Sequence, residues 1–156
     1  MPKYETNQQL VGYIRRLAGE FQGFNSQSVA MSGEMVQMLQ GQITYRTYRT
    51  FVALFTKPGT KQDTLVLSLP FLRLSDKSPE SLLQKLLEWN NGATESVHFA
   101  IDELLNTVNI VCVRPADTLV YAEFSACMDN MVAVRTNASR SLQSQFGGTG
   151  EIRELQ

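Results

Sequence analysis

The sequence predicts an α+β fold in which three helices pack an antiparallel sheet of about five strands, in the order α-β-β(-β)-α-β-β-α. Three observations support this prediction: apolar stripes at helical period near both ends of the chain, a capped helix over residues 78–92, and two strands over residues 97–113. Together they describe a two-layer domain.

Length and composition fit one globular domain. The chain has 156 residues, of which 43% are hydrophobic and 19% charged, and its net charge is -1. A balance so close to neutral supplies no overall field that attracts nucleic acid or anionic lipid. We expect one domain over residues 1–146 and a flexible tail over residues 147–156, which begins Gly-Gly-Thr-Gly.

The N-terminus and the cysteines indicate the compartment. The chain begins MPKYETNQQ, without the apolar core of a signal peptide, and no run approaches the ~20 apolar residues of a membrane span. Cys112 and Cys127 match no zinc or redox spacing, and we interpret them as small buried hydrophobes in a reducing compartment. We therefore expect a cytoplasmic protein.

The first helix is predicted from an apolar stripe at spacings of four and three. Thr6 and Gln9, three residues apart, resemble a capping box, and Gly23 is the expected stop. The stripe consists of Leu10, Ile14, Leu17 and Phe21.

Residues 25–41 are compatible with a short helix or with a strand. Met31, Met35 and Met38 recur at helical spacing, whereas residues 35–39 suit a strand equally well. Both alternatives stay open.

Two strands of a hairpin follow. Residues 43–56 are dominated by Thr, Tyr, Phe, Val and Ile, which is strand composition, and residues 57–60 form a turn. In residues 63–69 alternate leucines share one face. We expect residues 43–56 and 63–69 to pair as an antiparallel hairpin.

The second helix has clear boundaries in the sequence. Ser78 fits the N-cap and Pro79 the first turn, where its missing N–H costs nothing. Gly92 can take the left-handed conformation of a C-cap.

Two strands and a long helix complete the chain. Residues 97–101 alternate, as a half-buried strand does, and residues 108–113 are apolar on both faces, which is typical of a strand covered on both sides. Pro115 ends the pairing, and apolar residues three and four apart predict a helix over residues 117–146.

The residues LLQKLLEWNNG, then SVHFAID, then NIVCVRP, then a long amphipathic helix, resemble the YbjN group of proteins. That group shares its fold with the type III secretion chaperones. The Trp89-Asn90 pair before a hairpin is the most specific part of the resemblance. The resemblance implies a homodimeric α+β domain that binds a polypeptide or acts as an adaptor.

The residues support no catalytic centre, so we predict a protein that is not an enzyme. His98 is the one histidine, and Asp102 lies ~13 Å from it along the same strand face, too far for a shared metal. No G-x-S-x-G motif occurs, and Cys112 is expected to be buried between valines. We predict no metal and no cofactor.

Aromatic and cationic side chains interleave at Tyr45, Arg46, Tyr48 and Arg49. On one strand, Tyr45 and Arg49 would share a face. Such a pattern fits a solvated strand with cation–π packing, a protein-binding edge, or a patch that stacks on bases and grips phosphates.

Met35 and Met38 are the second set of candidate contacts, because methionines make adaptable binding surfaces, although they also fill cores. Trp89, Val111 and Val113 are the candidates for self-association, because one strand cannot bury both faces within a thin two-layer domain. We expect a homodimer.

The function that these features favour is a non-enzymatic protein-binding module, chaperone- or adaptor-like. It would capture a partner polypeptide on an apolar sheet face or along a strand edge. The alternative is a nucleic-acid-associated regulator that uses the Tyr/Arg patch.

Overall fold

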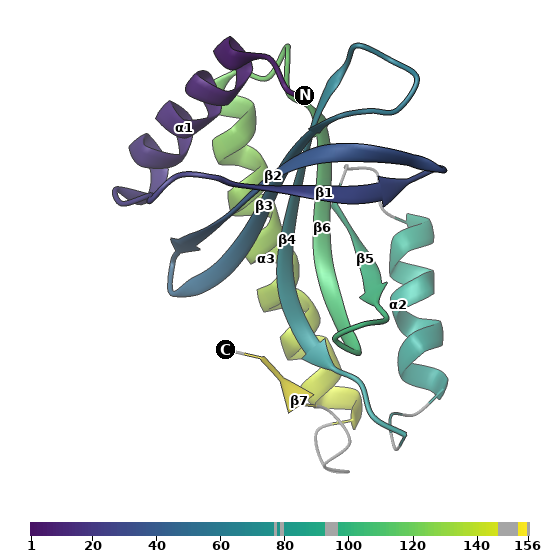
Figure 1. Ribbon diagram of the computed structural model, residues 1–156. Coiled ribbons are helices and arrows are strands. Elements are labelled where there is room, and N and C mark those ends of the chain that lie inside the picture. Colours follow the sequence, from purple (N-terminus) through teal and green to yellow (C-terminus); the bar gives the residue numbers. More distant parts are fainter. Residues whose placement is uncertain (77, 79, 93–96, 147–152, 156) are drawn as a thin grey trace. The chain divides into compact units, whose positions relative to one another are not determined.

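Figure 1 shows the computed structural model of the chain, which describes residues 1–76, 78, 80–92, 97–146 and 153–155. Within these ranges lie three helices: α1 (Tyr4–Ala18), α2 (Glu80–Gly92) and α3 (Tyr121–Phe146). The same ranges contain seven strands: β1 (Asn25–Met31), β2 (Glu34–Tyr45), β3 (Tyr48–Thr56), β4 (Asp63–Arg73), β5 (Val97–Asp102), β6 (Thr107–Pro115) and β7 (Arg153–Glu154).

The strands form an antiparallel sheet in the order β1-β2-β3-β4-β6-β5, and β7 pairs with β4 off this path. The α+β class and the three helices are confirmed, while the strand count exceeds the expected five. The chain divides into two compact units. The N-terminal unit consists of Met1–Leu67 and Val113–Ala126, and the C-terminal unit of Ser68–Cys112 and Cys127–Gln156. One domain over residues 1–146 stays a prediction.

The core of the N-terminal unit lies where α1 packs against β2, which pairs with β3. Its buried apolar side chains include Leu10, Ile14, Leu39, Ile43, Val52 and Leu54. The Phe21 ring lies directly on the backbone of Gly41, because a Cβ at position 41 would stand 2.9 Å from two of its ring carbons. Position 41 therefore has to be glycine for the ring to pack there.

The boundaries of α1 differ from the prediction. Lys3 is the N-cap residue and makes no side-chain cap, while Thr6 is buried inside the helix, so the capping box is wrong. The helix ends at Ala18 because Gly19 takes a φ of 82°. Phe21, expected on the helix stripe, is buried in the connection to β1 instead.

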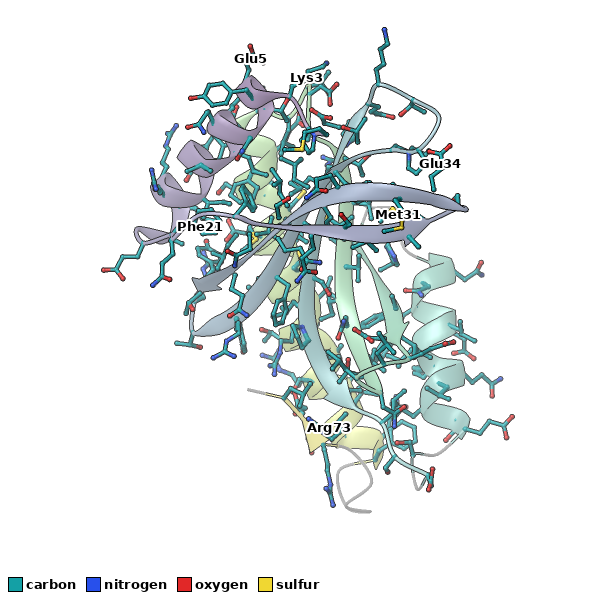
Figure 2. All side chains as sticks on the ribbon, in the orientation of Figure 1. Lys3, Glu5, Phe21, Met31, Glu34 and Arg73 are labelled. Atoms are coloured by element: carbon teal, nitrogen blue, oxygen red, sulfur yellow. The ribbon has the colours of Figure 1, made fainter. Side chains whose placement is uncertain are left out.

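Residues 25–45 form a long hairpin, which decides between the helix and the strand. β1 and β2 pair from Asn25–Gln40 to Met31–Glu34. Figure 2 shows Met31 and Glu34 beside the turn that joins the two strands.

A second two-residue turn divides what the sequence predicted as one strand over residues 43–56. Arg46 and Thr47 have φ angles of 49° and 72°, and Tyr45 pairs with Tyr48 across them. Positive φ at both central residues is a hairpin geometry normally signalled by Asn-Gly or Asp-Gly. Arg-Thr carries no such signal, so the prediction of one strand over residues 43–56 was wrong.

The start of the last helix is displaced by a hydrogen-bonded cluster in the N-terminal unit. The Asp117 carboxylate accepts a bond from the Asp63 backbone N–H at 2.8 Å and lies 3.3 Å from Lys3 Nζ. The Asp63 carboxylate accepts bonds from the Lys3 backbone N–H at 2.9 Å and the Thr56 hydroxyl at 2.8 Å. Asp117 is therefore held before the helix, which begins at Tyr121.

The C-terminal unit contains α2, β5 and most of β6 and α3, close to where they were expected. β5 and β6 pair from Val97–Cys112 to Asp102–Thr107. α2 begins at Glu80, while Pro79 lies outside the described residues. Buried apolar side chains of this unit include Leu69, Phe71, Leu82, Leu86, Ile110, Met128 and Leu142.

The last described residues include a short strand, and the flexible tail expected over residues 147–156 stays a prediction. Arg153 and Glu154 form β7 and pair with β4. The glycine-rich segment 147–150 lies outside the described residues.

Candidate functional site

The edge of β1 lacks the protection that edge strands usually carry. β1 stands at one end of the strand order and, in the described part of the chain, pairs with a strand on one side. Its sequence, NSQSVAM, contains no charged residue and no proline, the two commonest devices that block edge pairing. Residues 25–28 are all exposed. The edge therefore presents backbone donors and acceptors that an added strand could use.

The strand at the other end of the order, β5, is closed at Phe99 by a side chain of α2. The Asn90 amide donates to the Phe99 carbonyl at 2.8 Å and accepts from the Phe99 backbone N–H at 2.7 Å. These are the two bonds that a neighbouring strand would make. The Trp89 ring packs on the Phe99 ring at a centroid distance of 5.7 Å. The Trp89-Asn90 pair thus covers this edge.

An open groove lies in the N-terminal unit on the sheet face opposite the Phe21 ring. Phe55 follows the core residue Leu54 and so points to this opposite face. Among the residues that line the groove are Met31, Phe55, Lys57, Thr64, Val113 and Pro115. Because Met31 ends β1, the groove is continuous with the β1 edge and offers apolar side chains beside it.

Met35 and Met38 are not brought together. A spacing of three residues puts them on opposite faces of β2, with Met38 8% exposed and Met35 71% exposed. Met35 lies opposite Ala30 of β1, next to the bare edge. Met35 is therefore accessible to a partner, whereas Met38 is part of the buried interior.

The Tyr/Arg patch gathers at the end of the β2–β3 hairpin. Tyr45 and Tyr48 face each other, and the Arg46 guanidinium lies 5.2 Å from the centre of the Tyr45 ring. Arg49 is exposed and lies opposite Thr44. The turn puts Tyr45 and Arg49 on opposite faces, not on one face as a single strand would.

The three predicted self-association residues lie in different surroundings. Trp89 is half-buried on α2 in the C-terminal unit, as is Val111 on β6. Val113 belongs to the N-terminal unit and is 41% exposed. Along β6, Ile110 and Cys112 point inward and are fully buried. The outward valines thus leave apolar surface on the other side of this strand.

The structure places the residues that were considered for catalysis in the β5–β6 hairpin. His98 pairs with Val111, and the Asp102 carboxylate accepts the N–H groups of Leu104 and Leu105 to close the β5–β6 turn. Cys112 is fully buried, so its thiol is shielded from substrates. Among the residues that the structure describes, no group of three or more His, Cys, Asp or Glu side chains is placed to hold a metal ion.

Comparison with known families decides the class of protein. The Tir chaperone protein (CesT) family matches residues 50–139, which is more than half of the chain. The chain belongs to this family. Its membership confirms the secretion-chaperone part of the resemblance seen in the sequence, and it supports a chaperone-like role in which the protein binds a partner.

Solved structures share the fold of this CesT-family chain. Four chains match, one of them in the crystal structure of the ExsC-ExsE complex. That chain and this CesT-family chain share 16% sequence identity, with a TM-score of 0.50, over 88% of this chain and 93% of the other. The likeness shows the fold. No curated protein matches the sequence, and no helix in the described ranges is long and apolar enough to cross a membrane.

Proposed function

We propose that this CesT-family protein is a non-enzymatic chaperone or adaptor that holds an extended segment of a partner polypeptide along the edge of β1. The bare, uncharged edge is the observation that carries the proposal. Its seven residues span ~24 Å at the strand rise of about 3.4 Å per residue, enough for a strand of similar length to pair with it. The similar structure of the ExsC-ExsE complex, in which two proteins are bound together, supports this proposal.

The groove and the exposed methionine supply side-chain contacts in this proposal. Backbone pairing gives affinity without sequence preference, so specificity has to come from alternate side chains of the added segment. Those that point toward the groove would meet Phe55 and Val113, and those on the opposite face would meet Met35. The expected partner segment is therefore extended, with apolar residues at alternate positions.

Lysines on the edge test the proposal. The tagged protein is used to isolate partners from an extract of its source organism, as wild type and as the double variant Ser26→Lys, Ser28→Lys. Both serines are exposed, so the variant should fold, but two lysines on an edge oppose strand addition. Ser81→Lys, at an exposed position of α2, adds the same kind of charge away from the edge.

A stoichiometric protein partner should co-purify with wild type and with Ser81→Lys, and the purified partner should bind the edge variant at least ~10-fold more weakly, about 1.4 kcal/mol. Equal affinity of the edge variant would contradict capture along β1. Recovery of nothing but the protein itself would contradict the chaperone role.

A second candidate function rests on the hairpin end where Tyr45, Arg46, Tyr48 and Arg49 gather. Stacking rings beside guanidinium groups suit single-stranded RNA. The test is an electrophoretic mobility shift of a labelled RNA in low salt. A shift with wild type that is lost in the double variant Arg46→Ala, Arg49→Ala would support this function. RNA binding that is insensitive to this variant would refute the role of the patch.

Self-association is a separate part of the proposal, with Trp89, Val111 and Val113 as contacts of a homodimer. Val113, 41% exposed, is the outermost of the valines on β6. The cytoplasmic location expected from the sequence stays a prediction.

A further inference from the structure

The C-terminal residues add a short strand to the edge of β4 within the C-terminal unit. Glu154 lies opposite Leu72 and Arg153 opposite Arg73, and the Leu155 backbone N–H donates to the Phe71 carbonyl at 2.8 Å. Figure 1 shows β7 beside the end of β4. This is β-augmentation of the protein by its own chain, at an edge other than that of β1.

A buried arginine receives this segment. Arg135 of α3 is 7% exposed, and its guanidinium donates to the Leu155 carbonyl and lies 3.9 Å from the Glu154 carboxylate. A second residue of α3, Gln143, donates to the same carboxylate at 3.0 Å. The Arg135 guanidinium also lies over the Phe71 ring, 5.5 Å from its centre.

This arrangement has the parts of a peptide-binding site. The β4 backbone from Phe71 to Arg73 pairs with an extended main chain, while Arg135 and Gln143 bind an acidic side chain. A guanidinium removed from water requires an anion or carbonyl beside it, and the tail supplies one of each. Nothing in these contacts depends on the segment belonging to the same chain.

We propose that this β4 edge is a binding site for an extended partner segment in which an acidic residue precedes an aliphatic one, and that Arg153–Leu155 occupy it as an internal competitor. The proposal rests on the proposed function, since it requires a partner polypeptide. Charge complementarity to Arg135 and continuity with the β4 backbone select this occupant. Binding of the partner displaces the tail, so the affinity of the full chain is lower than that of the vacated site.

The test uses a fluorescein-labelled peptide with the sequence of residues 149–156, TGEIRELQ, and measures its binding by fluorescence anisotropy. The full chain is compared as wild type and as the tail variant Glu154→Lys, Leu155→Asp, whose own tail no longer matches the site. The tail variant should bind the peptide at least tenfold more tightly than wild type. Equal binding by the two proteins, or no binding by a folded tail variant, overturns the proposal.

Arg135→Gln in the tail variant should abolish binding, while Arg140→Gln, an exposed arginine on the same helix, should leave it unchanged. If Arg135→Gln does not fold, the test instead uses a peptide in which lysine replaces the second glutamate, the counterpart of Glu154. The tail variant must fail to bind that peptide, and binding of equal strength overturns the proposal.

Two further outcomes distinguish the β4 site from a contact between copies and from the β1 edge. A wild-type dimer that is lost in the tail variant would identify the occupant as the tail of a second copy, which contradicts a partner segment. The double variant Ser26→Lys, Ser28→Lys should bind the peptide normally. If the tail variant does not bind the peptide, while capture of the partner still depends on the β1 edge, the β4 site is refuted and the proposed function stands.

Discussion

Replacing Asp63 with alanine is expected to destabilise the N-terminal unit by ~3–5 kcal/mol. The Asp63 side chain is 1% exposed and accepts bonds from the Lys3 backbone at 2.9 Å and the Thr56 hydroxyl at 2.8 Å. Hydrogen bonds to charged groups contribute about 1.5–3 kcal/mol each, so the two together contribute ~3–6 kcal/mol. Removing a buried carboxylate recovers part of its desolvation cost, which lowers the upper limit.

Two further variants should lose less stability than Asp63→Ala, each by a different amount. Asp63→Asn keeps one oxygen acceptor but turns an NH₂ group toward a donor, so about half of the effect, ~1.5–3 kcal/mol, should remain. Asp117→Ala removes the ion pair with Lys3, in which the Lys3 side chain is 56% exposed and the Asp117 side chain 25% exposed. It also removes one bond to the Asp63 backbone N–H. Together these should cost only ~1–2 kcal/mol.

Thermal and urea unfolding monitored by circular dichroism measure these differences, with Trp89 fluorescence as a probe of the C-terminal unit. At ~2–4 °C per kcal/mol for a chain of this length, Asp63→Ala should unfold ~6–20 °C below wild type. The order of loss should be Asp63→Ala, then Asp63→Asn, then Asp117→Ala. An Asp63→Ala protein within ~1 kcal/mol of wild type would show that the cluster does not hold the unit together.

Three other substitutions test separate contacts. Asn90→Ala removes both bonds to Phe99 and should cost ~1–3 kcal/mol and raise self-association in light scattering, whereas unchanged stability and mass would contradict edge protection. Gly41→Ala should cost ~1–3 kcal/mol in urea unfolding, because its Cβ would stand 2.9 Å from the Phe21 ring; a neutral effect would mean that the ring moves freely. Val111→Lys should give a soluble monomer by sedimentation, and an unchanged mass would refute self-association through β6.

The parts of the fold that sequence predicts best are those with local signals. The helix over residues 80–92 and the β5–β6 pair follow from a periodic pattern bounded by glycine and proline, and each was placed within a few residues. The β2–β3 turn escaped prediction because Arg46 and Thr47 take positive φ without the residues that normally mark it. The β2–β3 pairing on either side holds that turn, although Arg46 and Thr47 have no local preference for it.

The candidate sites likewise divide into features that local sequence signals predicted and features that they did not. The sequence grouped Tyr45 and Arg49, which both lie near the end of the β2–β3 hairpin, but their relative faces depended on a turn that has no sequence signal. The β1 edge was missed because residues 25–41 left helix and strand open. The run from Phe21 to Gly33 contains no charged residue, but that feature alone does not indicate an edge strand, because edge strands usually carry charge. β7 escaped prediction, because its partners Leu72 and Arg135 are distant in sequence.

The unequal protection of the β1 and β5 edges limits how copies of the protein can assemble through strand pairing. If both edges were open, β1 of one copy could join β5 of the next, and this head-to-tail contact could repeat into a filament. The Asn90 amide removes one of the two ends that such growth needs. Between two copies of this protein, the β1 edge of one can still pair with the β1 edge of the other, which is a twofold contact that closes after two copies. The Asn90 side chain thus opposes head-to-tail growth through β5 while the β1 edge stays available to an added strand.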